Sequence, residues 1–129
     1  MRHRMLNAKI HRARVTEADL DYIGSISIDA ALLERAGIHP NEQVAVYNLS
    51  NGERFETYAI PGEPGQVRLN GAAARLAQVG DRVIIVTYVD VDADELADHE
   101  PRVVVVDENN QPVPHDGDGR LRVAAEPGT

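Results

Sequence analysis

Short aliphatic runs, each closed by a turn signal, constrain this sequence more than any other feature. Apolar and polar residues alternate over residues 4–16, with a change of phase near Arg12. Further apolar runs occupy residues 43–49, 53–60, 66–69, 82–91 and 103–106. Runs of this length are typical of strands. Aromatic residues are only 4% of the chain, so the core must be built from Ile, Val, Leu and Ala. We therefore predict a mainly β fold, a small barrel with short helices.

Turn and cap residues set the element boundaries. Asn51-Gly52 is a strong tight-turn signal, which predicts that the runs on either side form a hairpin. Asp29 can cap a helix over residues 30–36, and Gly37 would end it.

The chain length allows one domain. With 129 residues there is material for one core, which we place in residues 1–107. The acidic stretch 92–100 is predicted to be a helical or extended connector that Pro101 stops. Pro, Gly and charged residues dominate the end of the chain, which predicts a flexible C-terminal tail over residues 108–129.

The charge is negative and unevenly distributed. A formal net charge of −8 disfavours a nucleic-acid-binding protein, because neutralising phosphates needs clustered Lys and Arg. Residues 1–14 nevertheless carry five basic residues and no acid, whereas residues 90–108 are strongly acidic. The basic segment could attract a small anion. Alternatively, it is a strand that pairs with an acidic neighbour.

Several classes of site are disfavoured by composition. The chain has no cysteine, which excludes disulfides and thiolate metal sites and fits a reducing cytoplasm. The five histidines lack metal-ligand spacing, so we expect no metal. No apolar run approaches the length of a membrane span, and we expect a cytoplasmic protein with no membrane contact.

Three short segments carry the functional signal. They are Tyr22-Ile23-Gly24-Ser25, Arg54-Phe55-Glu56-Thr57-Tyr58 and Asn70-Gly71-Ala72-Ala73-Ala74. In this order and spacing, over about residues 5–91, the chain resembles the pyruvoyl-dependent aspartate 1-decarboxylase family. A Gly-Ser pair alone would be an ordinary turn, but the ordered set is much more specific.

The resemblance implies a fold, an assembly and a reaction. The fold would be a double-psi β-barrel, assembled as a homotetramer with active sites between subunits. The chain would be a zymogen that cuts itself between Gly24 and Ser25 into residues 1–24 and 25–129. Ser25 would become a pyruvoyl group, with no pyridoxal phosphate and no metal. The enzyme would be a lyase that decarboxylates L-aspartate to β-alanine and CO2 for pantothenate and coenzyme A synthesis. A maturation factor is a possible further partner.

The resemblance also implies a role for each matching residue. Ser25 would form the Schiff base with the substrate as the pyruvoyl group, and Tyr58 would donate a proton. The substrate would contact Thr57, Lys9, Arg54, Asn70, Gly71, Ala72 and Ala73. Thr57 would also stabilise the oxyanion formed during self-cleavage.

The residues themselves agree with these roles in part. Arg54, Glu56 and Tyr58 alternate and so share one strand face, whereas Thr57 falls on the other. Lys9 is the only lysine, which hints that its compact ammonium matters.

Four further residues are open to more than one interpretation. Glycine at position 24 would remove a Cβ from a crowded carbonyl. Asn70 could be the cap of a short helix over residues 72–77, a site residue, or both. Tyr22 would line the pocket or be a core aromatic. His11, on the face of Lys9, is a candidate for tuning the cleavage.

Two other functions compete with that of an enzyme. A barrel that only binds partners would need neither the Gly24-Ser25 pair nor the surrounding Lys, Arg and Tyr. A DNA-binding barrel of the swapped-hairpin type is disfavoured by the negative charge.

Overall fold

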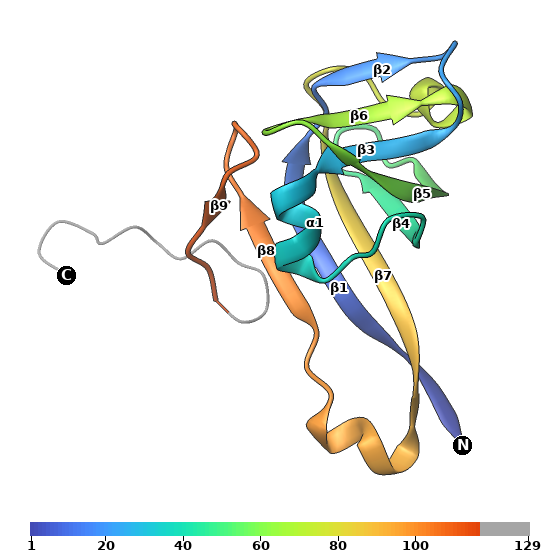
Figure 1. The fold of residues 1–129 in the computed structure, drawn as a ribbon, viewed down its shortest axis with the longest axis vertical. Helices are drawn as coiled ribbons and strands as arrows, with labels where there is room; N and C mark the ends of the chain where they lie inside the picture. The colour runs from blue at the N-terminus through green and yellow to red at the C-terminus, as the bar shows by residue number, and fades with distance from the viewer. Residues whose placement is uncertain (117–129) are drawn as a thin grey trace, which may run out of the picture.

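The structure is a computed structural model that describes residues 1–116 (Figure 1). The fold is mainly β, as the aliphatic runs predict. The strands are β1 (Arg2–Arg14), β2 (Glu17–Asp19), β3 (Ser25–Asp29), β4 (Gln43–Asn48), β5 (Arg54–Gly62), β6 (Val67–Asn70), β7 (Arg82–Asp92), β8 (Arg102–Val106) and β9 (Pro112–Val113). The helices are α1 (Ala30–Ala36) and two 3₁₀ helices, η1 (Gly71–Arg75) and η2 (Ala93–Asp98).

The strands form one mixed sheet in the order β2-β6-β3-β5-β4-β7-β1-β8-β9. Three of its pairs are parallel: β1 with β8, β2 with β6 and β3 with β5. The sheet curls back on itself (Figure 1). Thr16, just after β1, donates its backbone N–H and its hydroxyl to the carbonyl of Val67 in β6, at 2.8 and 3.0 Å. The end of β1 therefore meets a strand from the far side of the sheet.

Local signals set α1 and the β4–β5 hairpin where they were predicted. The Asp29 side chain accepts a hydrogen bond from the N–H of Ala31 at 2.8 Å, and Gly37 ends the helix in the left-handed conformation (φ 73°). Gly52 turns the hairpin with φ 81°, and β4 pairs with β5 in antiparallel register. The predicted phase change is a bulge in β1, at which Arg12 has φ 68°.

The core is aliphatic. Its large, fully enclosed side chains are Ile10, Val15, Ile26, Ile28, Leu32, Val44, Val46, Val67, Leu69, Val83, Ile85 and Val105. Burying each such side chain contributes roughly 1.5–3 kcal/mol. The tyrosines of the chain are absent from this cluster, which matches the low aromatic content.

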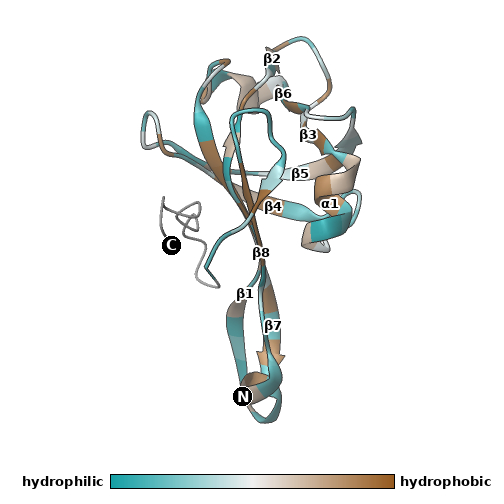
Figure 2. Ribbon diagram, turned by 90° about the vertical axis from the view of Figure 1, so that its left-hand side faces the viewer, coloured by the Kyte–Doolittle hydropathy of each residue, from teal (hydrophilic) through white to brown (hydrophobic). Residues whose placement is uncertain are grey.

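The basic N-terminal segment pairs with an acidic neighbour, which was the second of the two interpretations. Figure 2 shows the start of β1 and the end of β7 projecting together from the sheet as a narrow arm. Along it, Arg2 pairs with Asp92 and Arg4 with Asp90, each at 3.3 Å. The four side chains are exposed, so each pair contributes at most about 1 kcal/mol. No helix among residues 1–116 is long and apolar enough to span a membrane.

Two local predictions differ from the structure. The predicted helix over residues 72–77 is the 3₁₀ helix η1, and the Asn70 side chain makes no cap hydrogen bond to it. The first residues of the predicted tail are packed against the domain: β9 pairs with β8, and Asn110 is 1% exposed. Residues 117–129 of that predicted tail lie outside the described part of the chain.

Candidate active site around Ser25

A buried polar cluster surrounds the Ser25 hydroxyl. Ser25 is the first residue of β3 and is 1% exposed, and Asn70 lies opposite it in β6 with no exposed surface. The Nδ2 of Asn70 donates to Ser25 Oγ at 2.8 Å and to Ser27 Oγ at 3.2 Å. The serine is intact in this structure, and its oxygen is held in place by a side-chain amide. Asn70 is therefore a partner of Ser25 and not a helix cap.

Gly71 brings the start of η1 against the residues before Ser25. Its φ is +63°, and a Cβ on Gly71 would lie 2.8 Å from Gly24 Cα and 3.2 Å from the Tyr22 carbonyl oxygen. A side chain at position 71 is thus excluded twice, by backbone conformation and by space. The small residues of η1 allow its backbone to reach Gly24, as the sequence predicts.

Gly24 itself is not crowded. A Cβ built there would meet no described atom within 4 Å. Apart from its chain neighbours, no described atom therefore requires glycine at position 24, and the relief of a crowded carbonyl at Gly24 stays a prediction. The close approach belongs to Gly71, and the sequence could not distinguish the two glycines because each precedes or follows a polar residue in a short loop.

Strand β5 carries three candidate residues past Ser25. It runs parallel to β3 with Ile26 opposite Ala59, so extending the register by one residue sets Tyr58 beside Ser25. Arg54 and Tyr58 are exposed, and they lie on one face of β5 because strand side chains alternate. Thr57 is half-buried on the other face, opposite the core residue Val44. The structure thus separates Thr57 from Arg54 and Tyr58, as the alternation predicts.

Two strands, β4 and β7, lie between β5 and Lys9 in β1. Lys9 pairs with Val86 in β7, Val86 with Ala45 in β4, and Ala45 with Glu56 in β5. Residues paired in this way point to the same face of a sheet. Lys9 therefore shares a face with the Arg54–Tyr58 row, separated from it by the small side chain of Ala45 and by Val86.

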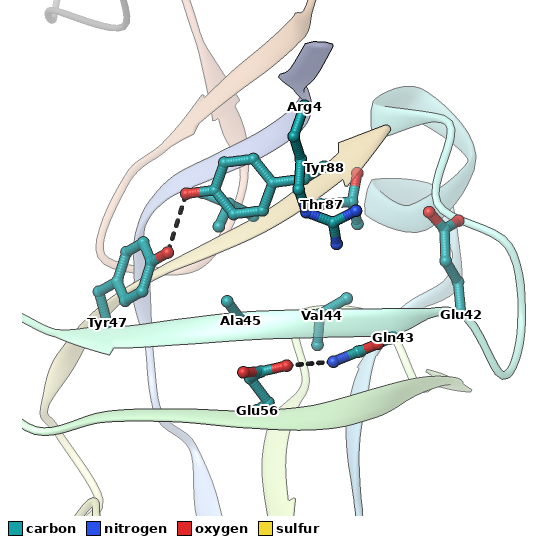
Figure 3. A pocket seen from close by; sticks show the side chains of 10 residues that line it. Arg4, Glu42, Gln43, Val44, Ala45, Tyr47, Glu56, Thr87 and Tyr88 are labelled. Atoms are coloured by element: carbon teal, nitrogen blue, oxygen red, sulfur yellow. Dashed lines mark hydrogen bonds between the residues drawn. The ribbon is translucent and has the colours of Figure 1, made fainter. Parts of the chain in front are cut away.

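Arg54 stacks on Tyr47, which lines a cavity together with Tyr88. The Arg54 guanidinium lies over the Tyr47 ring, 4.1 Å from its centre, and the Tyr47 hydroxyl hydrogen-bonds that of Tyr88 at 2.8 Å. This hydrogen bond and burial raise the pKa of Tyr88. Both tyrosines line a cavity of about 330 Å³ between β4 and β7 (Figure 3). Glu56 and Gln43 hydrogen-bond each other across its rim.

Comparison with known proteins decides the family. A model of the family described as aspartate decarboxylase matches residues 1–113. This chain belongs to the aspartate decarboxylase family. The family resemblance predicted from the three short segments is thereby confirmed.

Named relatives agree with the family assignment. The chain is 62% identical over 109 residues to an aspartate 1-decarboxylase of Neisseria meningitidis, covering 83% of this chain and 86% of the relative. It is 56% identical over 108 residues to an aspartate 1-decarboxylase of Staphylococcus epidermidis, covering 82% and 84%. A Geobacillus enzyme of the same name is 55% identical over 109 residues, covering 83% and 86%.

The residues around Ser25 fit a pyruvoyl group, the prosthetic group on which this family is known to depend. A pyruvoyl group can form only where a serine hydroxyl is positioned next to the preceding carbonyl. Ser25 follows Gly24 directly, and its buried hydroxyl is fixed by Asn70. Two described side chains lie next to it: the Asn70 amide, through its hydrogen bond, and Tyr58, through the strand register. Both suit an organic prosthetic group.

The structure also shows the surroundings of Tyr22 and His11, for which the sequence left more than one role open. Tyr22 is not a core aromatic: it is 50% exposed, and the Arg68 guanidinium lies 4.5 Å from its ring centre. His11 is half-buried, and its Nδ1 has no hydrogen-bond partner within residues 1–116. Burial lowers the pKa of His11, and the positive charges of Lys9 and Arg12 lower it further by smaller amounts.

The described carboxylates that could meet at a metal ion lie far from this cluster. Asp92, Asp94 and Glu95 have ligand atoms within 4.8 Å of one another, at the exposed tip of the arm (Figure 1). Exposed acidic groups of this kind are common without an ion. They belong to a different part of the fold from Ser25 and Asn70.

Sequence reasoning missed three contributors. Strand pairing brings Ser27 to Asn70 and Tyr88 to Tyr47, although these residues lie far apart in the sequence. Gln43 meets Glu56 in the same way. Ser27 could have been found from its position, because residues two apart in a strand share a face. Tyr88 has no such local indicator.

Proposed function

We propose that this chain is an aspartate 1-decarboxylase proenzyme that cuts itself between Gly24 and Ser25. The mature enzyme converts L-aspartate to β-alanine and CO2, and so supplies pantothenate and coenzyme A synthesis. The observation that carries the proposal is the buried Ser25 hydroxyl, held by Asn70 directly after Gly24, in a chain of this family.

Self-cleavage uses groups of the chain alone. The Ser25 Oγ bonds to the carbonyl carbon of Gly24, the peptide C–N bond breaks, and the hydroxyl proton goes to the freed amine, which leaves an ester. Elimination then releases residues 1–24 as a carboxylate and leaves dehydroalanine at position 25. Water hydrolyses this group, ammonia departs, and residues 25–129 begin with a pyruvoyl group. The first step depends on proximity, which a hydrogen-bonded and buried hydroxyl supplies.

Asn70 and the start of η1 support the cleavage step. The amide of Asn70 fixes the attacking oxygen, and the contact between Gly71 and Gly24 fixes the residue under attack. Thr57, in the strand next to β3, is proposed to supply the hydroxyl that stabilises the oxyanion, which requires a local bend or a neighbouring subunit to bring it to Gly24, because it lies on the other face of β5 from Tyr58. Removing one donor of this kind typically costs about 10²–10³ in rate.

The residues on the exposed face of β5 serve the substrate. The pyruvoyl ketone supplies an electron sink as CO2 leaves. Arg54 binds a substrate carboxylate through its planar fork, which stacking on Tyr47 holds in one plane. Lys9 binds carboxylate as a compact charge. Tyr58, beside Ser25 in register, returns the proton to the product.

The segment after Asn70 completes the substrate site. Gly71, Ala72 and Ala73 offer backbone N–H groups with little side chain to block an anion. The closeness of Gly71 to Gly24 supports a place for the substrate next to the new terminus of residues 25–129.

We further propose a double-psi barrel over residues 1–107, assembled in the cytoplasm as a homotetramer with sites between subunits. The mixed, curled sheet with three parallel pairs supports this barrel. The exposed face that carries Arg54, Tyr58 and Lys9 supports a site that a neighbouring subunit completes. Residues 108–116 add contacts to the domain.

Intact mass spectrometry with an aspartate assay tests the proposal. The purified protein should consist of residues 1–24 and 25–129, the larger lighter than its serine-ended form by one ammonia, and should form β-alanine. Ser25→Ala should remain a single chain and form none, because no hydroxyl is left to attack. Warming with host extract decides whether a maturation partner takes part. An uncut, inactive wild-type chain under all these conditions, or β-alanine from Ser25→Ala, would overturn the proposal.

A further inference from the structure

Ser27 shares the amide that holds Ser25. The two serines lie two residues apart in β3, so their side chains leave the same face of the strand. Ser27 is 7% exposed, and Asn70 has no exposed surface. Asn70 Nδ2 reaches Ser27 Oγ at 3.2 Å as well as Ser25 Oγ at 2.8 Å. A primary amide has two N–H bonds, so each hydroxyl can receive one of them.

The second hydrogen bond gives the Asn70 amide a second fixed contact on β3, so the amide cannot turn freely about its contact with Ser25. The last torsion of an asparagine side chain is broad and roughly twofold, and does not itself choose between nitrogen and oxygen. The Oδ1 of Asn70 is buried and has no partner among the described residues. Within residues 1–116, the Ser27 hydroxyl is therefore the side-chain contact besides Ser25 that limits the rotation of the Asn70 amide.

We propose that Ser27 is a positioning residue for self-cleavage. Its hydroxyl fixes the rotation of the Asn70 amide, and the fixed N–H in turn places the Ser25 oxygen beside the Gly24 carbonyl. Ser27 touches neither atom of the bond that breaks. The inference rests on the proposed function, in which Ser25 Oγ attacks Gly24. Because attack depends steeply on the position of the nucleophile, an amide free to rotate slows it.

Two variants of equal shape test this role. Ser27→Thr keeps a hydroxyl at position 27, and Ser27→Val replaces that hydroxyl with a methyl of similar size. Both are β-branched and suited to a strand. We expect Ser27→Val to cleave about threefold to tenfold more slowly than wild type, the loss typical of one hydrogen bond. Ser27→Thr should cleave at close to the wild-type rate. The readout is the appearance of residues 25–129 by intact mass in freshly purified protein.

Matched controls separate positioning from folding. Each substitution is repeated with Ser25→Ala, which cannot cleave, and the two melting temperatures are compared. Equal melting temperatures with unequal cleavage rates support the proposal. If the valine variant does not fold, Ser27→Ala, which is smaller than serine, takes its place with the same expectation. Wild-type cleavage rates in the folded valine or alanine variant would overturn it.

The outcome for wild type distinguishes this inference from the proposed function. If wild type does not cleave with or without host extract, the proposed function fails, and the role of Ser27 fails with it. If wild type cleaves and only the Ser27 variants behave unexpectedly, the proposed function stands and this inference alone is wrong.

Discussion

The backbone of Gly71 lies against the backbone of Gly24, with no room for a side chain between them. A Cβ on Gly71 would lie 2.8 Å from Gly24 Cα and 3.0 Å from its nitrogen. Real Cβ atoms essentially never approach other atoms so closely. The contact joins the first turn of η1 to the proposed cleavage site, and it depends on glycine at position 71 alone.

Gly71→Ala should therefore block or strongly slow cleavage. The methyl group must displace Gly24 or η1, and either movement takes the Gly24 carbonyl out of line with Ser25. Gly52→Ala is the matched control, because Gly52 also has a positive φ (+81°), but a methyl group there would meet no described atom within 4 Å. Both variants bear the left-handed penalty of about 1–2 kcal/mol. The cleavage rate, measured by intact mass, should fall for Gly71→Ala and not for Gly52→Ala. Equal rates in the two variants would count against the contact.

Tyr58→Phe should still cleave but decarboxylate poorly. The phenol is proposed as the proton donor to the product, and the ring that supports the local packing remains. Loss of a general acid typically lowers turnover about 10²–10⁴-fold. Turnover is measured as β-alanine formed per mole of cleaved chain, so that incomplete cleavage does not lower the measured value. Unimpaired turnover would remove Tyr58 from the acid role.

Arg54→Lys should raise the KM for aspartate about tenfold, with a smaller effect on kcat. A lysine keeps the charge but has neither the planar fork nor the stacking that Arg54 makes on Tyr47. Arg35→Lys, on the exposed side of α1, is the control for a change of this type elsewhere. Steady-state kinetics of the two cleaved variants decide the matter, and an unchanged KM for Arg54→Lys contradicts the proposed carboxylate contact.

Local chemistry explains which parts of the fold could be predicted. Asp29 and Gly37 bound α1 through contacts with residues within a few positions, and Asn51-Gly52 turns the hairpin within itself. Such features need no knowledge of distant partners. The same holds for the alternation that sets Arg54 and Tyr58 on one face of β5.

Contacts between distant strands explain what could not be predicted. Asn70 looked like a helix cap because it precedes small residues, but the pairing of β3 with β6 sets it opposite Ser25. Tyr47 and Tyr88 meet only because β4 and β7 are neighbours. Family resemblance supplied the site residues, and it carried no information on Ser27, which the three matching segments omit.

The stability of the folded chain should depend on the protonation of His11. Burial lowers the pKa of His11 below its ordinary value of 6.5, and the nearby charges of Lys9, Arg12 and His115 lower it further. Well above pH 6.5 the imidazole is neutral in both states and contributes no pH dependence. As the pH falls below 6.5, the unfolded chain takes up the proton first, so stability is lost.

His11→Gln should reduce this loss. Melting temperatures of uncleavable Ser25→Ala protein, with and without His11→Gln, are compared between about pH 7.5 and pH 5.5, a range that brackets the ordinary histidine pKa. The wild-type histidine should show the steeper fall. His3→Gln, on the exposed arm, serves as the control. Parallel curves for the proteins with and without His11 would show that its burial does not affect stability in this range.

Asn110 should hold the segment after β8 to the domain, although the sequence suggests a tail there. Its Oδ1 accepts a hydrogen bond from the Arg14 N–H at 2.7 Å, and its Nδ2 donates to the carbonyls of Arg14 and Gly65, each at 2.9 Å. Asn110→Gly retains the positive φ of 58° without strain but removes all three bonds. At roughly 1 kcal/mol for each bond, the free energy of unfolding should fall by about 2–4 kcal/mol. Asn109→Gly, at the exposed neighbouring position, should change it far less in the same denaturant titration. Equal, small effects at both positions would mean that residues 108–116 contribute little to the stability of the domain.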